Sequence, residues 1–187
     1  AAAARREFGP EVRNIVFMGM GEPLDNFDHV VQAVRVLTDR VGLSFSVSRT
    51  TISTVGRIAG IRRLAELGWR RLNVAVSLNA PNDAIRSRIM PISRTDPMPA
   101  LREALLAYPL RKCQFFMIEY VLIPGLNDAP EHADELADFL RPVACARCSA
   151  KRASSFSESL SRDYAPALSL LGSGLGPCAL CGCSGPA

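Results

Sequence analysis

Short apolar segments alternate with amphipathic segments along residues 12–140, and this alternation restricts the possible folds more than any other feature of the sequence. Apolar residues recur at helical spacing in the segments between the apolar runs and after the last one. The runs themselves are rich in β-branched and aromatic residues, which favour strands. The predicted strands are 14–18, 50–54, 72–78 and 115–123. The order βαβαβαβα predicts an α/β fold around a parallel sheet.

The predicted helices have recognisable ends. In the first, apolar positions run through 27–41, and Asn26 stands where a side chain can cap the helix. The second covers 58–67 and is ended by Gly68, because glycine favours the left-handed backbone that follows many helices. Two further helices are expected at 101–108 and 132–140.

The composition changes abruptly at residue 142. Ser, Cys, Gly, Ala and Pro dominate 142–187, and strand-forming runs are lacking there. We therefore expect three regions: an N-terminal extension (1–11), a βα domain (12–141) and an irregular Cys/Ser/Gly-rich tail (142–187). The tail is expected to be disordered, or to be translated from a shifted reading frame.

The overall composition does not suggest a membrane protein. Apolar residues make up 48% and charged residues 21% of the chain, as in ordinary globular domains. There is no run of about 18 apolar residues, and residues 1–6 do not resemble a secretory signal. We expect a cytoplasmic protein that does not contact a membrane.

Arginine supplies most of the positive charge, in a chain whose net charge is +4. It clusters at 62–63, at 70–71 and at Arg86 with Arg88. The guanidinium group binds phosphate with two parallel hydrogen bonds, so the clusters are compatible with an RNA partner. From charge alone, a solvated helix face is the favoured interpretation.

The six cysteines are unevenly distributed: Cys113 is alone, and the others lie between Cys145 and Cys183. Without a secretory signal, a disulfide framework is disfavoured. Two C-x-x-C pairs, at 145–148 and 178–181, have a spacing that could hold zinc. The long spacer between them lacks the alternating apolar residues of zinc-ribbon strands, so we favour the shifted reading frame.

A glycine-rich turn, Met18-Gly19-Met20-Gly21-Glu22, follows the first predicted strand. The two glycines lack side chains where the backbone could approach a ligand, and Glu22 supplies a carboxylate. Ligands of parallel α/β sheets bind at the carboxyl ends of the strands. Alone, the turn is also compatible with a simple tight connection.

Further polar motifs follow the later strands, and together with the glycine turn they form an ordered series. Its members are Thr51-Ile52-Ser53-Thr54-Val55-Gly56, residues 75–83, Arg86, 90–92, 119–122, 125–128 and 131–133. Over 12–141 this series resembles the RlmN/Cfr family of radical S-adenosylmethionine (SAM) RNA methyltransferases. The resemblance implies an incomplete parallel (βα) radical SAM barrel with an irregular C-terminal tail.

The resemblance also implies a SAM site. In the family, the Gly-Glu pair contacts the SAM ammonium group, and the serine after the next strand donates to the SAM carboxylate or ribose. Asn79 stands in place of the histidine of the Ser-Leu-His segment, so a polar side chain remains but a titratable one is lost. The implied cofactor-binding residues are Gly21, Glu22, Ser53, Ser77, Leu78 and Asn79.

Glu119 lies within the apolar run of the fourth predicted strand. A charged side chain in such a position needs a partner. We expect it either to pair with an arginine inside the barrel or to belong to the site.

The resemblance implies cofactors and partners as well. Family members bind a [4Fe-4S] cluster through a C-x-x-x-C-x-x-C loop, a spacing that is absent from this sequence. The residues after Cys145 do not match the family segment that carries the methyl-bearing cysteine. We therefore expect a monomeric fragment, inactive as written, without an assigned catalytic residue or metal ligand. Its parent enzyme methylates C2 of adenosine in 23S rRNA and possibly tRNA, with a reductant protein as a partner.

Two other functions are compatible with parts of the sequence. One is a non-catalytic SAM- or RNA-binding module with a zinc-binding tail. The other is an α/β-barrel hydrolase or epimerase, which would need inward-facing acids or histidines. The two histidines, His29 and His132, fall on predicted helices, and this disfavours the hydrolase.

Overall fold

The computed structural model of the chain describes residues 1–9 and 11–143. In this part of the chain, four parallel strands form one sheet in the order β1-β2-β3-β4. The strands are β1 (Ile15–Phe17), β2 (Thr50–Thr54), β3 (Asn73–Ser77) and β4 (Met117–Glu119). Parallel neighbours in chain order require a crossover after each strand, and helices provide these crossovers. The predicted α/β class and its parallel sheet are confirmed.

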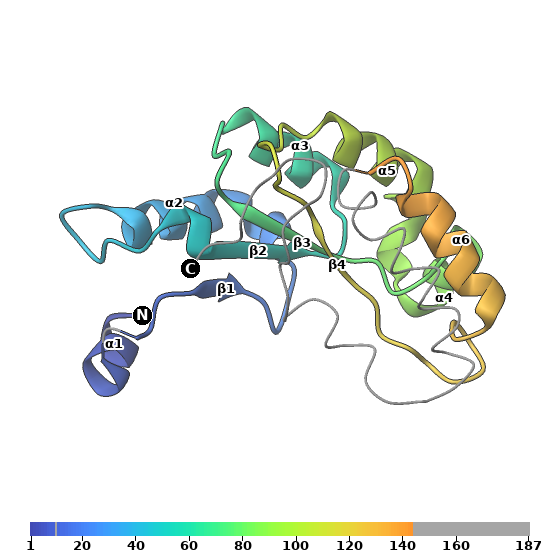
Figure 1. Cartoon of the computed structure of the whole chain (residues 1–187), viewed down its shortest axis with the longest axis horizontal. Coiled ribbons are helices and arrows are strands. Elements are labelled where there is room, and N and C mark those ends of the chain that lie inside the picture. Colours follow the sequence, from blue (N-terminus) through green and yellow to red (C-terminus); the bar gives the residue numbers. More distant parts are fainter. Residues whose placement is uncertain (10, 144–187) are drawn as a thin grey trace.

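Helices cover one face of the sheet. Figure 1 shows α2 (Phe27–Thr38), α3 (Ile58–Glu66) and α5 (Met98–Ala107) above the strands, and α4 (Asp83–Ile89) and α6 (Pro130–Leu140) beyond their carboxyl ends. The first helix, α1 (Ala2–Phe8), lies on the side of β1. Short 3₁₀ helices occur at η1 (Pro23–Asn26), η2 (Val47–Arg49) and η3 (Pro91–Arg94).

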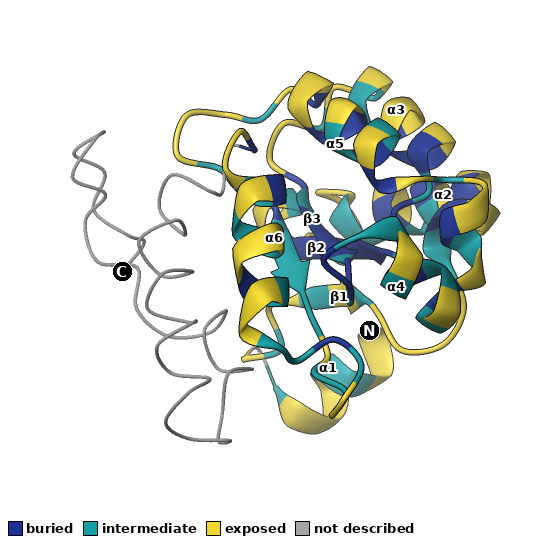
Figure 2. Ribbon diagram, turned by 90° about the vertical axis from the view of Figure 1, so that its right-hand side faces the viewer, coloured by how far each residue is buried: buried dark blue, intermediate teal, exposed yellow. Residues whose placement is uncertain are grey.

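The apolar core lies between the sheet and these helices. Ile52, Val74 and Val76 project from β2 and β3 into this layer and are buried, together with Ile61 of α3 and Leu101 of α5. Each such side chain contributes about 1.5–3 kcal/mol through its removal from water. Figure 2 shows the central strands largely buried and the outer turns of the helices exposed.

The opposite face of the sheet is more polar. Side chains alternate between the two faces of a strand, so Ser53 and Ala75, which are opposite each other in the register, share this face. Ser77 and Glu119 are also opposite each other on it, one step nearer the carboxyl ends. The hydroxyl and carboxylate groups therefore gather where the strands end.

The fourth strand is much shorter than the predicted 115–123, because β4 ends at Glu119. In the residues after Glu119, the backbone amides donate hydrogen bonds to side chains and not to a neighbouring strand. The amide of Val121 donates to Asn79 Oδ1 at 3.0 Å, and the amide of Ile123 donates to Asn127 Oδ1 at 2.6 Å. The other three strands lie within one residue of their predicted ends.

The first large helix also differs from the prediction. It ends at Thr38, and Val41 is 96% exposed in the following turn, where its amide donates to Asp39 Oδ1. Asn26 occupies the N-cap position of α2, but its side chain makes no capping bond and instead contacts His29 Nδ1 at 2.7 Å. Val41 was therefore wrongly assigned to the apolar face.

Two helices were not predicted, for a shared physical reason. None of the residues of α1 is buried, and the buried residue of α4 is Arg86. Neither helix therefore has a stripe of buried apolar residues at helical spacing. The helix α4 is begun by Asn82, whose side chain accepts a hydrogen bond from the amide of Ile85 at 3.0 Å. Both histidines lie on helices, as predicted.

Within the described residues, none of the helices combines the length and apolar character needed to cross a bilayer. The predictions for the tail, including zinc binding by the cysteines from Cys145 onwards, concern residues outside the described range, as do the methyl-bearing cysteine and the shifted frame. The three-region division of the chain remains a prediction.

Candidate cofactor-binding site

The glycine-rich turn leaves β1 at the carboxyl end of the sheet. Gly19 and Gly21 have φ angles of 124° and 83°, values that side chains strongly disfavour. An added Cβ would meet no atom within 4 Å at either position. The glycines are therefore required by backbone conformation, and the exposed turn leaves open space beside it.

Glu22 is held by two backbone amides. Its Oε1 accepts a hydrogen bond from the amide of Leu24 at 2.9 Å, and its Oε2 accepts one from the amide of Val55 at 2.7 Å. The second bond joins the turn after β1 to the turn after β2. A carboxylate offers about four lone-pair positions, so two remain for a cationic ligand group. The side chain is thus oriented without being saturated.

Ser53 of β2 and Ser77 of β3 meet at the carboxylate of Glu119. Ser77 Oγ donates to Glu119 Oε2 at 2.6 Å, and Ser53 Oγ donates to the same oxygen at 3.3 Å. Of the two alternatives for Glu119, the structure favours the site residue, because no described arginine forms an ion pair with it. Its position in β4 was visible in the sequence, but its contacts depend on the strand register.

Leu78 and Asn79 continue from β3 at the same end of the sheet. The side chain of Leu78 is fully buried in the core, its amide donates to the carbonyl of Glu119 at 2.9 Å, and its carbonyl accepts from Arg86. Asn79 has a φ of 57°, a left-handed conformation in which asparagine is enriched among residues with side chains. Its Oδ1 accepts from the amide of Val121, and its Nδ2 contacts Met90 Sδ at 3.5 Å. This side chain joins the ends of β3 and β4.

Asn127 is a structural residue of the site whose role the sequence did not reveal. It is buried, and its Nδ2 donates to the carbonyls of Asn79 at 2.7 Å and Val121 at 2.8 Å. Its Oδ1 accepts from the amide of Ile123. The loop after β4 is thereby fixed against the end of β3. The sequence included it in the motif segment 125–128 but gave it no role.

Arg86 corrects the expectation that all the arginine clusters are surface features. It is fully buried, and its guanidinium donates to the carbonyls of Leu78 at 3.2 Å, Asp96 at 3.2 Å and Val55. Burial lowers the pKa of Arg86, and the nearby Asp83 and Asp96 oppose this shift. The residue holds together the chain segments that follow β2 and β3, and it cannot contact RNA phosphate.

The remaining arginines of the clusters, Arg62, Arg63, Arg70, Arg71 and Arg88, are exposed. Arg63 is already paired with Asp28 at 2.6 Å and stacks over the ring of Phe27. The exposed arginines of this group therefore fit both a solvated surface and a phosphate partner.

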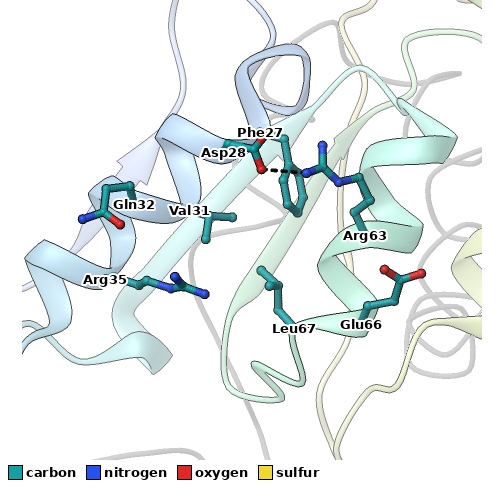
Figure 3. A pocket seen from close by; sticks show the side chains of 8 residues that line it. All are labelled: Phe27, Asp28, Val31, Gln32, Arg35, Arg63, Glu66 and Leu67. Carbon is teal, nitrogen blue, oxygen red and sulfur yellow. Dashed lines mark hydrogen bonds and ion pairs between the residues drawn. The ribbon is translucent and has the colours of Figure 1, made fainter.

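A hollow of about 370 Å³ lies elsewhere, between α2 and α3. Figure 3 shows its lining, with Arg63 directed toward Asp28 and with Arg35 and Glu66 around it. The hollow is on the outer helical layer and contains none of the predicted cofactor residues. We place the candidate site at the carboxyl ends of the strands, because polar side chains from all four strands or their following turns come together there.

The candidate site fits SAM by the chemistry of its groups. Glu22 keeps lone pairs available for an ammonium group, and the hydroxyls and carboxylate on the polar face suit a nucleoside. Among residues 1–9 and 11–143, no three His, Cys, Asp or Glu side chains are grouped closely enough to hold a metal ion.

Comparison with known proteins agrees with this arrangement. The sequence profile of the radical SAM superfamily matches residues 2–140. A crystal structure of a radical SAM methyltransferase from Sphaerobacter thermophilus superposes with a TM-score of 0.71 and 42% sequence identity. The match covers 76% of this chain and 42% of that chain.

The names of curated relatives identify the family more narrowly than the superfamily profile does. The chain is 43% identical over 139 residues to the dual-specificity RNA methyltransferase RlmN of Syntrophus aciditrophicus, a match that covers 73% of this chain and 39% of the relative. It is 49% identical over 133 residues to the RlmN enzyme of Geotalea uraniireducens, covering 71% of this chain and 38% of the relative. The chain spans about 40% of the length of these relatives. With the sheet, the glycine turn and the polar strand ends, these matches establish that the chain belongs to the radical SAM superfamily, within the RlmN/Cfr family of RNA methyltransferases.

Proposed function

We propose that the described domain binds SAM and belongs to an enzyme that methylates C2 of adenosine in 23S rRNA and tRNA. The observation that carries the proposal is that Glu22, Ser53 and Ser77 lie at one end of the sheet, where Glu119 accepts hydrogen bonds from both serines. The names of the relatives, which describe dual-specificity RNA methyltransferases, support an RNA substrate. We further propose that this enzyme acts in the cytoplasm as a monomer and has a reductant protein as a partner.

In this proposal the residues of the chain bind and orient SAM. Glu22 accepts hydrogen bonds from the ammonium group of the methionine moiety, while the amides of Leu24 and Val55 hold the carboxylate in place. The turn with Gly19 and Gly21 leaves space for the ligand to approach the protein backbone closely. A [4Fe-4S] cluster supplies the electron for SAM cleavage in this superfamily, and we assign no described residue to its ligation.

The exposed arginines Arg62, Arg70, Arg71 and Arg88 support an RNA partner in a general way. Each provides a charge that can neutralise phosphate, but phosphate contacts carry no sequence information. The choice of C2 and of the target adenosine therefore rests on the resemblance to the family.

The SAM site is tested with the full 187-residue chain. We expect Glu22→Gln to weaken SAM binding about tenfold or more in equilibrium dialysis, since a charge-assisted hydrogen bond is worth about 1.5–3 kcal/mol. The same substitution is expected to leave binding of 5′-methylthioadenosine nearly unchanged, because that ligand lacks the ammonium group. Circular dichroism before dialysis checks that the variant is folded.

Glu66→Gln is the matched control. Glu66 is exposed and lines the hollow between α2 and α3, so its substitution is expected to leave SAM affinity unchanged. If Glu66→Gln weakens SAM binding and Glu22→Gln does not, SAM binds in the hollow and the proposed site is wrong.

Methyl transfer is tested in a chimera. Residues 12–141 replace the matching segment of the Syntrophus aciditrophicus relative, and 2-methyladenosine in 23S rRNA and tRNA is measured by mass spectrometry. We expect the chimera to methylate both RNAs and its Glu22→Gln form to lose the activity. A folded chimera that binds SAM without methylating either RNA would favour a non-catalytic binding module.

A further inference from the structure

The amino ends of the strands carry positive charge that the candidate site does not use. The amino ends of parallel strands lie along one edge of their sheet, and here this is the edge opposite the candidate site. Five exposed basic residues lie in the segments that lead into β2, β3 and β4 at this edge, and we call them the amino-end patch: Arg49, Arg70, Arg71, Arg111 and Lys112.

No acidic residue balances the charge of the amino-end patch within the same segments. Residues 43–49, 67–72 and 108–116 contain neither Asp nor Glu. Among the described residues, no member of the patch forms an ion pair, whereas Arg63 is paired with Asp28 and Arg13 with Glu11. The charges of the patch therefore remain available for an anion outside the domain.

The backbone that carries the patch is tied together by side chains. Asn73 Nδ2 donates to the carbonyl of Ser48 at 2.9 Å and joins the segment before β2 to β3. Gln114 Nε2 donates to the carbonyl of Leu72 at 2.7 Å, and its Oε1 accepts from the amide of Arg111 at 3.1 Å. Three neighbouring segments are thus fixed relative to one another, which lowers the cost of ordering them when a ligand binds.

The two ends of the sheet have opposite chemistry. The candidate site presents the carboxylates of Glu22 and Glu119, which repel phosphate groups. The amino-end patch presents only positive charge, and four of its five members are arginines, whose guanidinium groups bind phosphate with two parallel hydrogen bonds. Since neighbouring strands lie about 4.8 Å apart, the patch extends along the edge and suits a chain of phosphates better than a single small anion.

We propose that the amino-end patch is a second RNA-docking surface, which binds the phosphate backbone without regard to sequence at the end of the sheet opposite the SAM site. The choice of RNA as the polyanion rests on the proposed function. The five residues of β2 alone separate the two ends by about 16 Å, so the patch contacts nucleotides other than the one in the site. It adds affinity and leaves the choice of adenosine to other contacts.

The test measures binding of a labelled oligouridylate to the full chain by fluorescence anisotropy, between about 50 and 200 mM salt. The double substitution Arg49→Gln with Arg71→Gln is expected to weaken binding about tenfold at the lower salt concentration. It should also make the dependence of the logarithm of affinity on the logarithm of salt shallower by about 1.4, because each phosphate contact to a single strand contributes about 0.7. A merely structural effect would lower the affinity without this change in slope.

A second pair and a matched control complete the design. Arg111→Gln with Lys112→Gln alters a different segment of the patch, and the same two changes are expected. Arg35→Gln with Arg94→Gln removes equal charge from exposed positions outside the patch, so affinity should change less than about twofold, since separated surface charges are screened by salt. Circular dichroism checks that each variant is folded.

Two results would overturn the inference. One is that both folded patch variants keep the affinity and salt dependence of the unsubstituted chain; the other is that the control pair weakens binding equally, because net charge alone would then explain the effect. Vesicles of phosphatidylserine test the other polyanionic surface. If the patch variants lose vesicle binding and retain oligouridylate binding, the patch binds lipid headgroups and the RNA assignment is wrong.

These outcomes are distinct from those of the proposed SAM site. Dialysis of SAM with Glu22→Gln tests that site without RNA. If Glu22→Gln leaves SAM affinity unchanged while the patch variants lose oligouridylate binding with the expected slope, the SAM assignment is wrong and the docking surface is supported.

Discussion

Arg86 places a positive charge in the interior of the domain without an ion pair among the described residues. Three of its five N–H donors bond instead to the carbonyls of Val55, Leu78 and Asp96. Two of these carbonyls follow strands that supply the candidate site. A single side chain therefore keeps the turns after β2 and β3 in place.

Replacing Arg86 with methionine tests this role. The apolar chain is roughly kept, but three carbonyls lose their donor, and each orphaned buried carbonyl costs about 1–3 kcal/mol. We expect the free energy of unfolding in urea to fall by about 3 kcal/mol or more. Arg88→Met, two residues away and exposed, is the control and should change it by less than about 0.5 kcal/mol. Equal effects at both positions would contradict the positioning role.

The helix α3 approaches η1 unusually closely, and Gly60 makes this possible. A Cβ at this position would lie 2.6 Å from Leu24 Cβ, closer than such atoms approach in proteins. Leu24 is buried directly after the glycine turn and Glu22. The packing of α3 on η1 thus supports the segment that carries the site.

Gly60→Ala is therefore expected to destabilise the domain. The overlap with Leu24 costs about 1–3 kcal/mol, which outweighs the gain of about 1 kcal/mol in helix propensity. Urea unfolding measures the net change. Gly42→Ala is the matched control, because a Cβ there meets Asp39 at an ordinary 3.6 Å. If Gly60→Ala raises the free energy of unfolding, then α3 can move away from η1 without loss of stability, and the close packing is not required.

The loop after β4 is the element whose conformation depends most on one side chain. Asn127→Ala removes three hydrogen bonds to the backbone of Asn79, Val121 and Ile123. At about 0.5–1.5 kcal/mol each, the loss is roughly 2–4 kcal/mol. We expect a lower Tm and faster amide exchange across 120–128, measured by mass spectrometry. Asn26→Ala is the control: within the described part of the chain, the Asn26 side chain hydrogen-bonds only with His29, so both measurements should stay unchanged. A similar effect there would argue against the role of Asn127.

These elements also explain what could be predicted from the sequence. The strands β2 and β3 were predictable because they are rich in β-branched residues, and the helix α3 because its apolar residues recur at helical spacing and Gly68, with a φ of 65°, follows its end. The short β4 was not, because its end depends on hydrogen bonds to Asn127 and Asn79. The helix α4 was missed because its buried residue is charged.

In the candidate site, too, some features could be predicted from the local sequence and others depend on contacts between strands. Ser53 and Ser77 lie in the last two residues of β2 and β3, and Glu22 lies in the turn after β1, so the strand pattern alone predicts their end of the sheet. The contacts of Glu119 require the parallel register that sets it opposite Ser77, and this register is a property of paired strands. The sequence alone left both interpretations of Glu119 open.

At the scale of the whole molecule, the sheet sets a hierarchy of stability. The central strands β2 and β3 are paired on both sides, whereas β1 pairs only with β2 among the described residues. All five residues of β2 are buried, while Val16 of β1 is 58% exposed. Opening β1 alone would therefore expose little apolar surface, and the site carried by its following turn lies beside the less stable edge.

We expect hydrogen exchange to follow this hierarchy. Amides of Thr50–Thr54 and Asn73–Ser77 should exchange only through global unfolding, whereas those of Ile15–Phe17 should exchange faster through local opening. Exchange mass spectrometry at increasing urea concentration measures both processes, and the central strands should show the steeper dependence, because global unfolding exposes more surface. SAM is expected to slow exchange in the turn after β1, since Glu22 joins it to Val55 across the strand ends. Equal protection of β1 and β2 without ligand would contradict this order, because it would require the edge strand to unfold only with the core.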